Sequence, residues 1–452
     1  MSNRRLLLVS ANRFTVPYPV YPLGISYLKA YLNETMPSLK IDVFDFMTGS
    51  FEDYIKLLHE IKPDFTGISL RNIDDVNIYR QESFISHYRQ IIKSTRENSS
   101  SVIVIGGSGF SIYPELLFKT LEPDFAVYGE GEISLEKLLS AIENNLDYST
   151  IEGLLYREHD RIVFNERKTF FNTPTLSFDS GMLDYYWQNS GMLNIQTKRG
   201  CPYNCIYCTY PLIEGHRVRT IDPGRIVKTL TDLKHRFNIN YIFFTDSVFN
   251  ISNSFNYRLA DKMIEAELDI RWGGYFNFAN IDFKLLEKLR QAGLKHIEFG
   301  TESLSDRMLE NYRKPFTVSE VLDISSACND LEIDFAHFLI LGGYGETEST
   351  LAETFENSKK INRTVFFPFI GMRIYPGTRL HEIAIAEKAV KPDDPLLEPV
   401  YYVSREIDID TLKEKAKRTQ KQWIFPDEDM SSAMMRMRKR NRKGPLWEYL
   451  LK

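Results

Sequence analysis

Three of the four cysteines in this chain lie within one short stretch, and their spacing constrains the structure more than any other feature of the sequence. Cys201, Cys205 and Cys208 follow a C-x3-C-x2-C pattern. Thiolates this close together, on a loop that has to curl around something, suit an iron–sulfur cluster, because thiolate is the ligand that such clusters use. Three cysteines leave one iron of a [4Fe–4S] cluster without a protein ligand, so that iron is available to a substrate or cofactor.

Other uses of these cysteines fit the sequence less well. A structural zinc site needs a fourth ligand nearby, and the next histidine, His216, falls outside the usual spacing of zinc fingers. A disulfide framework is not expected in a long chain with four cysteines, and the apolar run 6–10 is too short for a signal peptide. The fourth cysteine, Cys328, lies in a helical pattern, where we expect an ordinary buried residue.

The motif resembles the signature of the radical S-adenosylmethionine (SAM) enzymes, whose pattern is C-x3-C-x-aromatic-C. Tyr207 supplies the aromatic residue. The resemblance implies that Cys201, Cys205 and Cys208 hold a [4Fe–4S] cluster and that the open iron binds the amino and carboxylate groups of SAM. It also implies the reaction, in which one electron enters the cluster and SAM is cleaved to a 5′-deoxyadenosyl radical.

The residues around the motif alternate between strand and helix patterns from 191 to 385. Six strands are expected, at 193–197, 241–245, 270–276, 296–300, 334–341 and 365–370. Six strand–helix units predict a partial (β/α)6 barrel, whose chemistry lies at the carboxyl ends of the strands. The cysteine motif follows the first strand, so we expect it at that end of the barrel.

Polar residues follow three later strands of this predicted barrel, and the resemblance assigns them to SAM. Ser247 stands where related enzymes hold the amino end of SAM, although serine replaces the usual aspartate here. Glu302 lies in Gly-Thr-Glu-Ser, a motif whose polar residues face the SAM ribose. Arg373 stands where a guanidinium would form a bidentate pair with the SAM carboxylate. Each of these residues would also suit a turn or a helix cap.

Residues 1–150 form a second alternating pattern. Five strands are expected, at 5–10, 41–46, 64–70, 101–105 and 125–128. They predict an α/β fold with a doubly wound, mostly parallel sheet, which binds ligands at the carboxyl ends of its strands. Two glycine turns fall at those ends, Gly106-Gly107 and Gly129-Glu130-Gly131, and glycine lets a backbone approach a ligand closely. The same glycines would also suit tight turns without a ligand.

The order of these features resembles the cobalamin-binding domain that precedes the radical SAM domain in one large subfamily. The matching features are Pro22-Leu23-Gly24, Gly106-Gly107, Pro114-Glu115 and Gly129-Glu130-Gly131-Glu132. The resemblance implies that cobalamin binds at the two glycine turns, between the strand ends and the barrel mouth. Many cobalamin domains carry D-x-H-x-x-G, whose histidine binds cobalt, but Asp45-Phe46-Met47 stands at that place here. We therefore expect cobalamin without a histidine ligand, and a vestigial domain remains the alternative.

Two further segments complete the predicted organisation. Residues 151–190 resemble a linker that joins the two domains, with a hairpin formed by 154–157 and 161–164. Residues 386–452 form a mainly helical segment. It carries a basic run between Arg436 and Lys443. A solvated helical face is the default interpretation of such a run, and contact with an anionic substrate group or partner is the alternative.

Charge and hydropathy exclude several classes of protein. A net charge of −5 gives no basis for nucleic-acid binding. No apolar run reaches the roughly 18 residues that a membrane helix needs. We expect a cytoplasmic protein with no nucleic-acid partner and no membrane span. The resemblance adds a small-molecule substrate and an electron donor such as flavodoxin or ferredoxin.

The predicted function is that of a cobalamin-dependent radical SAM enzyme, a methyltransferase that acts on an unactivated carbon or on phosphorus of a small molecule or natural product. In this class, one SAM methylates cob(I)alamin and a second yields the radical that removes a substrate hydrogen atom. The alternative is an enzyme of the same architecture that catalyses cyclisation, rearrangement or transfer of another SAM-derived group. A non-enzymatic sensor is a third hypothesis, and it would form no 5′-deoxyadenosine.

Overall fold

The computed structural model describes residues 4–171, 176, 178–428 and 430–451, and the chain divides into two compact units. The first unit holds the residues before Val76 together with 82–186 and 212–215. The second unit holds 76–81, 187–211 and the residues from His216 onward, so it contains the cysteine motif. Each unit is built around one seven-stranded sheet.

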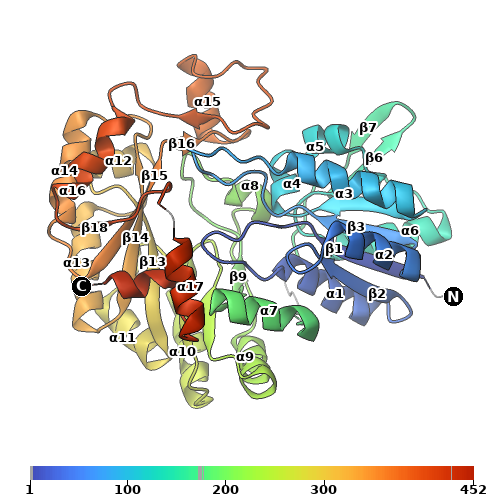
Figure 1. The fold of residues 1–452 in the computed structure, drawn as a ribbon, viewed down its shortest axis with the longest axis horizontal. Coiled ribbons are helices and arrows are strands. Elements are labelled where there is room, and N and C mark those ends of the chain that lie inside the picture. Colours follow the sequence, from blue (N-terminus) through green and yellow to red (C-terminus); the bar gives the residue numbers. More distant parts are fainter. Residues whose placement is uncertain (1–3, 172–175, 177, 429, 452) are drawn as a thin grey trace. The chain divides into compact units, whose positions relative to one another are not determined.

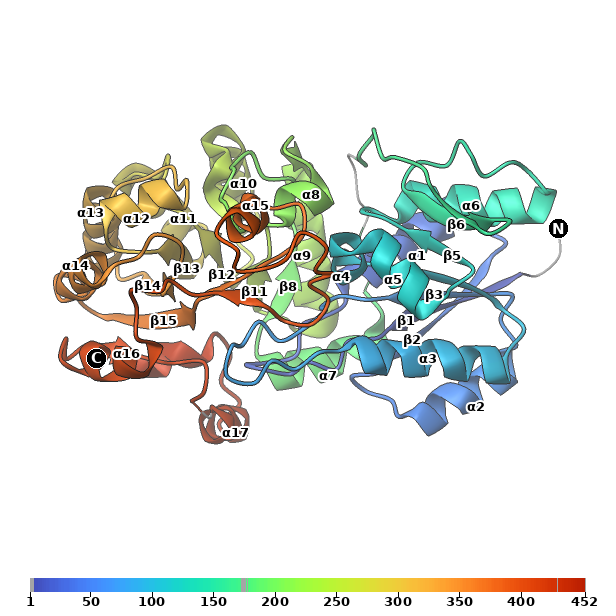
Figure 2. The same ribbon diagram turned by 90° about the horizontal axis from the view of Figure 1, so that it is seen from above.

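The first unit has the predicted doubly wound architecture. Its parallel strands lie in the order β2-β1-β3-β4-β5. They are β1 (Arg5–Ser10), β2 (Lys40–Asp45), β3 (Phe65–Ser69), β4 (Val102–Gly106) and β5 (Phe125–Val127). The helices that follow them are α1 (Leu23–Thr35), α2 (Phe51–Ile61), α3 (Ile85–Asn98), α4 (Ser108–Ile112), α5 (Pro114–Leu121) and α6 (Glu132–Asn144). Figure 2 shows α6 on one side of this sheet and α2 and α3 on the other.

The strand order of this sheet reverses direction between β1 and β3, because the chain leaves β1 for β2 on one side and returns to β3 on the other. Ligands of open α/β sheets bind in the crevice at such a reversal, outside the carboxyl ends of the strands. The loops after β1 and β3 are therefore the parts of this unit best placed to contact a ligand.

The predicted hairpin is present, and it extends the sheet instead of bridging two domains. β6 (Leu154–Glu158) and β7 (Arg161–Phe164) pair with each other, and β6 pairs antiparallel with β5. The first unit continues to Tyr186, part of the way along α7 (Ser180–Ser190). The hairpin within the segment that we expected to be a linker thus completes the first sheet, where Leu154 and Leu155 are fully buried.

The second unit contains the predicted parallel strands in the order β15-β14-β13-β12-β11-β8. They are β8 (Leu193–Ile195), β11 (Tyr241–Phe244), β12 (Arg271–Phe276), β13 (Leu294–Glu302), β14 (Asp334–Leu341) and β15 (Thr364–Ile370). The helices between them are α9 (Pro223–Phe237), α10 (Asn253–Glu265), α11 (Phe283–Gln291), α12 (Asp306–Asn311), α13 (Val318–Asp330) and α14 (Glu348–Ser358). The strand–helix alternation predicted from the sequence is confirmed (Figure 1).

The C-terminal segment is less purely helical than expected. After α15 (Arg379–Ala386), which ends where this segment begins, it contains helices α16 (Leu412–Lys417) and α17 (Ser431–Lys439), and the short 3-10 helices η2 (Ile409–Thr411) and η3 (Leu446–Leu450). It also adds β17 (Tyr401–Tyr402), which pairs with β16 (Met372–Arg373), and β18 (Gln422–Trp423), which pairs parallel with β15. Strands of two residues carry no periodicity, so the sequence pattern does not reveal them.

The two faces of the second sheet have different partners. Figure 2 shows α11, α12 and α13 on one side of this sheet and the C-terminus on the other. On the helix side, His337 of β14 lies 3.4 Å from the hydroxyl of Ser325 in α13. On the opposite side, Trp447 of η3 packs against the ring of His296 and donates its Nε1 to Glu298 Oε1 over 3.1 Å. Contact with Trp447 thus marks the side chains that point to the inside of the partial barrel.

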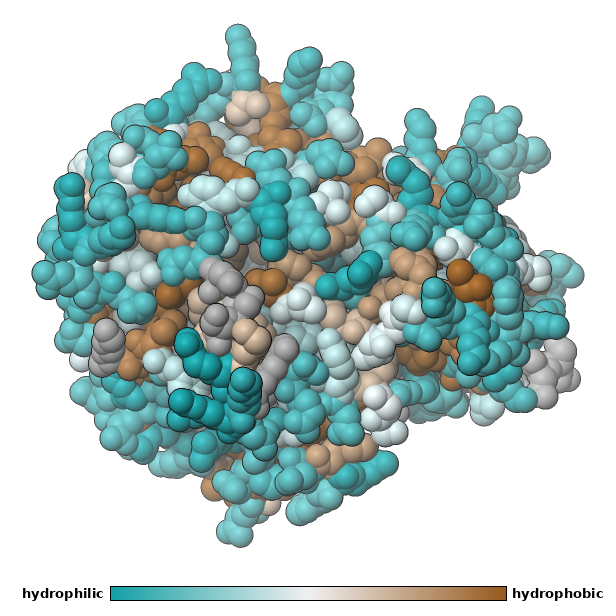
Figure 3. All heavy atoms as spheres, viewed as in Figure 1, coloured by the Kyte–Doolittle hydropathy of each residue, from teal (hydrophilic) through white to brown (hydrophobic). Residues whose placement is uncertain are grey.

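None of the helices in the described ranges is both long and apolar enough to cross a membrane. On the face drawn in Figure 3, hydrophilic residues predominate and hydrophobic residues are scattered among them. The apolar side chains are instead concentrated in the two sheets, where strand residues such as Leu6, Ile103, Phe244 and Leu339 are fully buried.

Several helices begin with the residues that capping favours. Asp222 accepts a hydrogen bond from the backbone N–H of Arg225, and Pro223 occupies the first turn of α9. At the start of α13, Thr317 and Glu320 form a capping box. The Glu320 carboxylate accepts from the Thr317 N–H over 2.7 Å, and the Thr317 hydroxyl accepts from the Glu320 N–H.

Replacing Thr317 with Ala should loosen the first turn of α13 without changing the sheet. Loss of an N-cap hydroxyl costs about 1 kcal/mol, so the amide hydrogen of Glu320 should exchange about fivefold faster. The matched control is Thr229→Ala inside α9, where the hydroxyl only bonds back to Arg225 O. Hydrogen exchange followed by mass spectrometry checks this, and equal effects of the two substitutions would contradict the capping role.

Candidate functional site

A buried ion pair holds the strand that leads into the cysteine motif. The Asp246 carboxylate, just after β11, accepts from the backbone N–H of Thr197 (2.6 Å) and of Lys198 (3.1 Å). Lys198 Nζ lies 2.8 Å from Asp246 Oδ2, and neither side chain has any exposed surface. Lys198 and Arg199 form β9, which pairs antiparallel with β10 (Arg219–Thr220). Only Gly200 separates β9 from the first cysteine, Cys201.

Each N–H group of the Lys198 ammonium has a hydrogen-bond acceptor. It donates to Thr197 Oγ1 (2.9 Å), to Asp246 Oδ2 (2.8 Å) and to the carbonyl oxygen of Phe249 (2.8 Å), which matches its three N–H groups. It also lies 4.2 Å from the centroid of the Phe249 ring, within cation–π distance. Burial lowers the pKa of Lys198, and the Asp246 carboxylate opposes that shift.

Gly200 connects this strand to Cys201 in a backbone conformation with φ +87°, which favours glycine. The hydroxyl of Ser247 donates to the Gly200 carbonyl oxygen over 3.3 Å. Ser247 therefore lies beside the start of the cysteine loop, where it helps to fix the turn. Its predicted contact with the amino end of SAM stays a prediction.

The rest of the loop is held by backbone bonds from two later segments. The N–H of Cys208 donates to Cys205 O over 3.2 Å and closes a turn. Ile206 between them donates its N–H to Tyr312 O (3.3 Å) and accepts from the N–H of Leu380 (2.7 Å). The loop that carries the cysteines is thus fastened to the ends of α12 and α15.

None of the three cysteines forms a disulfide, and the surroundings of two of them, Cys205 and Cys208, disfavour the thiolate. Cys201 is buried, and Cys205 and Cys208 are partly exposed. Burial raises the pKa of Cys205, an effect that Lys314 opposes, and burial raises the pKa of Cys208 to about 12. Only a strong positive charge at the site makes these thiols lose their protons at neutral pH, and a bound metal centre provides it.

The donor set fits a cluster better than a single ion. Within the part of the chain that the structure describes, no three His, Cys, Asp or Glu side chains are grouped to hold one metal ion. In a [4Fe–4S] cluster, each cysteine binds a different iron, so the three sulfurs do not need to converge on one point. The three-cysteine loop is consistent with a cluster, and its assignment as the cluster site stays a prediction.

Glu302 and Lys314 form a second ion pair next to this loop. Lys314 Nζ lies 3.2 Å from Glu302 Oε1, and the two side chains are only 8% and 13% exposed. The charges of Glu302, Cys205 and Cys208 outweigh the effect of burial and raise the pKa of Lys314, which stays cationic. The pKa of Tyr207 is raised well above its ordinary value, mainly by burial and then by Glu302. The predicted residues Tyr207 and Glu302 are thus brought together.

Glu302 also has an unusual backbone. It ends β13 with φ +62°, and the pairing of β13 with β14 shifts between Gly300 and Glu302. A non-glycine residue in this region costs about 1 kcal/mol or more and persists where the surroundings fix it. The irregularity turns the carboxylate toward Lys314 at the carboxyl end of the strand, which is where the sequence predicted a functional residue.

Arg373 is buried near the end of β15, as part of β16. Its guanidinium donates to the carbonyl oxygens of Ile374 (2.7 Å) and Leu396 (2.8 Å) and stacks over the ring of Tyr375. These contacts fix the orientation of the guanidinium. Its predicted pairing with the SAM carboxylate remains a prediction.

Two buried oxygens near the loop have no hydrogen-bond partner in the structure, the hydroxyl of Tyr312 and Oε1 of Glu346. The other oxygen of Glu346 accepts from the N–H of Gly342, and burial raises the pKa of Glu346 to about 7. A Cβ atom at Gly343 would lie 2.1 Å from the Tyr312 hydroxyl. Unpaired buried oxygens are costly, so these two are well suited to meet a bound ligand or water.

In the first unit, the Gly106-Gly107 turn is explained by packing within the protein. Gly107 has φ +102°, and a Cβ atom there would lie 2.7 Å from the carbonyl oxygen of Leu70. A Cβ at Gly106 would lie 3.1 Å from Val127 O. A side chain at Gly107 would thus strain the protein itself, so substitution there does not report on cofactor approach alone.

The second glycine turn is also occupied by protein groups. A Cβ at Gly129 would lie 3.0 Å from Arg167 Nε, and one at Gly131 would lie 3.0 Å from a side-chain carbon of Leu28. The carboxylate of Glu130 accepts from the N–H of Phe171 over 2.6 Å. The assignment of Gly106, Gly107, Gly129, Glu130 and Gly131 to cobalamin therefore stays a prediction, since each has a structural role.

A polar side chain that is better placed than the glycine turns to contact a cofactor follows β1. Asn12 is 5% exposed, and its amide Nδ2 is buried without a partner, while its Oδ1 accepts from the N–H of Phe14. It lies at the reversal point of the first sheet, beside the carboxyl end of β1. A buried donor without an acceptor at the usual ligand crevice of this fold fits a bound polar cofactor.

The segment that would carry a cobalt-binding histidine is packed differently here. Asp45 accepts from the Tyr186 hydroxyl (2.6 Å) and from the N–H of Met47 (3.1 Å), the residue at the histidine position. Burial raises the pKa of Asp45. The motif position itself is Met47, and the imidazole of His87 from α3 packs edge to face against Phe46, with ring centroids 5.3 Å apart.

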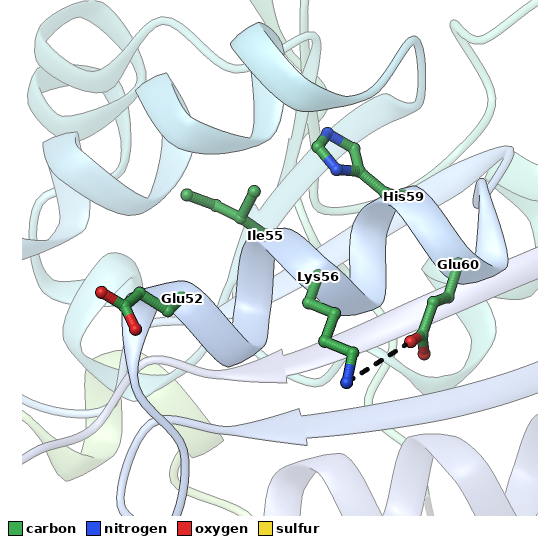
Figure 4. Close-up of a pocket in the computed structure, with 5 residues that line it drawn as sticks. All are labelled: Glu52, Ile55, Lys56, His59 and Glu60. Carbon is green, nitrogen blue, oxygen red and sulfur yellow. Dashed lines mark ion pairs between the residues drawn. The ribbon is translucent and has the colours of Figure 1, made fainter.

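A pocket on the outside of α2 does not belong to either site. It is lined by Glu52, Ile55, Lys56, His59 and Glu60 of that one helix (Figure 4). Its most evident interaction is an exposed ion pair between Lys56 and Glu60 at 3.9 Å. Such pairs contribute little, and the pocket contains none of the groups discussed above.

Five residues of these sites were not among the site residues predicted from the sequence: Lys198, Lys314, Tyr312, Glu346 and Asn12. Two of them have a positional signal, because Lys198 stands directly before the cysteine motif and Asn12 directly after a predicted strand. The other three come from turns after α12 and β14, and only the folded chain brings them to the loop.

Two family models match the chain. One, described as the radical SAM superfamily, matches residues 195–357, and the other, described as the B12 binding domain, matches residues 9–139. The first range contains the cysteine loop together with Ser247 and Glu302, and the second contains Asn12 and both glycine turns.

Known proteins align over most of the chain. It is 26% identical over 401 residues to a protein of Pyrococcus horikoshii named as an uncharacterized methyltransferase, and the match covers 85% of each chain. It is also 26% identical over 357 residues to the anaerobic magnesium-protoporphyrin IX monomethyl ester cyclase of Rubrivivax gelatinosus. That match covers 75% of this chain but only 62% of the cyclase.

The fold is similar to that of the radical S-adenosylmethionine methyltransferase TsrM from Kitasatospora setae, whose structure was solved with cobalamin and a [4Fe–4S] cluster. The TM-score is 0.87 at 21% identity, and the match covers 99% of this chain and 97% of the other. At this identity the similarity establishes the shared fold.

Replacing Cys201, Cys205 and Cys208 together by Ala should abolish cluster binding, because all three protein ligands are lost. Anaerobic reconstitution followed by iron and sulfide analysis should give about four of each per unaltered chain. The control is Cys328→Ala, which removes a fully buried thiol of α13 and should keep the iron. Iron and sulfide retained by the triple variant would refute the assignment.

Replacing Lys314 with Met should make the cluster harder to reduce, because a buried positive charge beside Cys205 and Cys208 favours the added electron. The reduction potential should become more negative by an amount on the order of tens of millivolts. Lys284→Met, at an exposed position on α11, is the control and should leave the potential unchanged. A spectroelectrochemical titration measures both, and equal potentials for the two variants would exclude this role of Lys314.

Proposed function

We propose that this chain, which combines a B12-binding domain with a radical SAM domain, is a cobalamin-dependent radical SAM methyltransferase. The observation that carries the proposal is the three-cysteine loop, fixed by the buried Lys198–Asp246 pair at the carboxyl end of the second sheet. The other half of the proposal rests on the doubly wound sheet in the first unit, with its ligand crevice beside β1. The relative named as a methyltransferase, aligned over 85% of both chains, supports the same activity.

The cluster and SAM belong to the second unit in this proposal. Cys201, Cys205 and Cys208 hold the [4Fe–4S] cluster, and Ser247, Glu302, Arg373 and Tyr207 are the predicted contacts of SAM. When bound, these groups supply a methyl group and a carbon radical that removes a hydrogen atom from the substrate. The protein contributes position and charge around them.

In this proposal, Lys314 and Glu302 adjust the charge beside the cluster and position a group that contacts SAM. Lys314 is cationic and nearly buried, so it offsets negative charge on the cluster thiolates. Its bond to Glu302 fixes the carboxylate at the strand end, where the carboxylate accepts a hydrogen bond from a hydroxyl donor such as a ribose. The buried side chains of this region also restrict water, which would quench a radical intermediate.

Cobalamin is assigned to the first unit. Asn12 supports this assignment, because its buried amide donor lacks a partner at the reversal point of the sheet. Cobalt has no histidine ligand in this proposal, since Met47 takes the corresponding place. The two glycine turns, Gly106-Gly107 and Gly129-Glu130-Gly131, are the predicted cobalamin contacts in this proposal, and they also shape the loops that carry them.

The substrate is a small molecule in this proposal, and the reducing electron comes from a carrier such as flavodoxin or ferredoxin. A reaction of this class needs one electron to cleave SAM and one more to return cobalamin to its cob(I) form, and such a carrier would supply both. We further propose that the enzyme works in the cytoplasm, where thiols stay reduced and the cluster can be assembled.

A second candidate function is an oxidative cyclisation or rearrangement on the same architecture. The 26% identity to a monomethyl ester cyclase over 75% of this chain favours it. In that case the first unit is a vestigial cobalamin domain, and SAM serves only as the source of the radical. The two candidates differ in whether a methyl group leaves SAM.

Reconstitution with hydroxocobalamin, iron and sulfide, followed by gel filtration, tests the proposal. About one cobalamin per chain should co-elute, as measured by the ultraviolet–visible spectrum. With dithionite and SAM labelled in its methyl group, the label should appear on cobalamin together with S-adenosylhomocysteine. 5′-Deoxyadenosine should also be released.

Asn12→Leu should weaken cobalamin retention without changing the iron content, and Asn144→Leu, at an exposed position on α6, is its matched control.

If no cobalamin co-elutes with the unaltered protein and SAM is still cleaved, the second candidate replaces methyl transfer. If neither S-adenosylhomocysteine nor 5′-deoxyadenosine forms in a fully reconstituted sample, the enzyme proposal fails and a sensor takes its place.

A further inference from the structure

We propose that residues 444–451 form a pH-dependent latch, which closes the inner face of the second sheet and is held shut by the protonated carboxyl groups of Glu298 and Glu448. The inner face is the side of this sheet that contacts Trp447, and Figure 2 shows α11, α12 and α13 on the opposite side. The inference concerns the second unit only, and it does not depend on which reaction the enzyme catalyses.

The latch starts from a fixed point on the sheet. The N–H of Gly444 donates to Gly191 O over 3.0 Å, and its φ of +108° favours glycine. A Cβ atom there would lie 3.0 Å from the ring of Tyr241. Directly before it, Lys443 Nζ donates to Trp187 O over 3.2 Å and lies 4.2 Å from the centroid of the Trp187 ring. The place where the latch begins is thus set by contacts that involve neither carboxyl group.

Apolar contacts hold the latch against the inner face. Trp447 is 4% exposed and belongs to the same buried cluster as Ala336 of β14, and Leu450 and Leu451 pack against that cluster. The ring of Trp447 also meets that of His296 edge to face at 78°, with centroids 5.6 Å apart. Burial lowers the pKa of His296 to about 3, so the imidazole is uncharged at neutral pH. This part of the attachment therefore does not change between pH 6 and pH 8.

Two hydrogen bonds join carboxyl groups across the same contact. Trp447 Nε1, on the latch, donates to Glu298 Oε1 of β13 over 3.1 Å. In the other direction, the hydroxyl of Tyr241 on β11 donates to Glu448 Oε1 of the latch over 2.9 Å. Glu298 is 4% exposed and Glu448 is half-buried. Closing the latch thus takes both carboxyl groups out of much of their contact with water.

Burial acts on the two carboxyl groups in the same direction. It raises the pKa of Glu298 from 4.5 to about 7, and it raises the pKa of Glu448 from 4.5 to about 7. The hydrogen bond from Trp447 opposes the first shift and the hydrogen bond from Tyr241 opposes the second. Because burial outweighs both bonds, the closed latch favours the protonated form of each group.

The surroundings of Glu298 provide no positive charge that would stabilise its carboxylate. Tyr275 of β12 and Ala336 of β14 lie beside it in the sheet. His296, on the same face of β13, is neutral. Among the described residues, the pKa of Glu298 responds only to burial and to the N–H of Trp447. An ionised Glu298 under the closed latch would thus be a buried charge without a counter-charge, which is costly.

The charges around Glu448 largely cancel one another. Asp334 of β14 raises the pKa of Glu448 further, whereas Lys295 and Arg271 lower it. Lys295 Nζ lies 2.7 Å from Asp334 Oδ2, and Arg363 pairs with the other oxygen of the same carboxylate. Their positive charges are therefore already paired, and burial remains the main influence on Glu448.

Closure therefore weakens as the pH rises. With the latch open, each carboxyl group returns to water and to an ordinary pKa of 4.5, whereas the closed state gives each a pKa of about 7. The closed state thus binds more protons between these two values, so closure is strongest below about pH 4.5 and is lost as the pH rises through about 7. Between pH 6 and pH 8, each group should lower the closing equilibrium constant about tenfold.

Hydrogen exchange of the cluster- and cobalamin-loaded enzyme, followed by mass spectrometry at pH 6 and pH 8, tests the inference. Each rate is divided by the rate of an unstructured peptide at the same pH, which removes the intrinsic effect of pH on exchange. Protection of the peptide 444–451 should be about tenfold to hundredfold lower at pH 8 than at pH 6. Protection of the peptide 334–341, which is β14, should stay the same, because the sheet itself remains folded.

A double variant, Glu298→Gln with Glu448→Gln, keeps both hydrogen-bond acceptors but cannot ionise. Its peptide 444–451 should be protected equally at pH 6 and pH 8. The matched control is Glu346→Gln, which removes another buried carboxyl group with a pKa of about 7, one that accepts from the N–H of Gly342. This control should keep the full loss of protection at pH 8. Near-ultraviolet circular dichroism checks that the variants are folded.

Equal protection of the peptide 444–451 at pH 6 and pH 8 in the unaltered enzyme would overturn the inference. A loss of protection that persists in the double variant would do the same, since it would then come from other groups. An equal loss in the peptide 334–341 would indicate general loosening of the unit and would also overturn it. Failure of the proposed function would be seen separately, as absence of both SAM-derived products.

Discussion

The buried ion pair between Lys198 and Asp246 is the interaction on which the rest of the site depends. It joins the strand before the cysteine motif to the end of β11, and neither side chain reaches solvent. A buried pair of this kind adds little net stability, but removing one partner leaves an uncompensated charge and costs about 3–5 kcal/mol. Its main contribution is therefore specificity, since it allows the cysteine loop to leave the sheet in only one register.

Both units use the same physical arrangement. In each, parallel strands end at a common edge, and the polar side chains that follow them are collected there. The first unit presents Asn12 at this edge and the second presents the cysteine loop, Ser247 and Glu302. The left-handed backbone of Glu302 lies at this edge of the second sheet.

Electrostatics divides the second unit into two regions. Beside the cysteine loop, charges are retained and paired, as in Lys314 with Glu302. Deeper on the inner face, burial favours the neutral forms of Glu298 and His296. The strands of one sheet thus carry a charged region at their carboxyl ends and a neutral region further inside.

The sequence by itself determined the order of strands and helices in both units, the place of the cysteine loop and the kind of centre it suits. These follow from local signals, because hydrophobic periodicity and thiolate spacing are properties of short stretches. Only the tertiary structure decided that β6 and β7 complete the first sheet, that β18 joins the second, and that Lys314, Tyr312 and Glu346 lie beside the cysteines. The physical reason is that pairing partners and buried charges depend on contacts between distant segments. A two-residue strand or a single lysine in a turn carries no local signal of where it will lie.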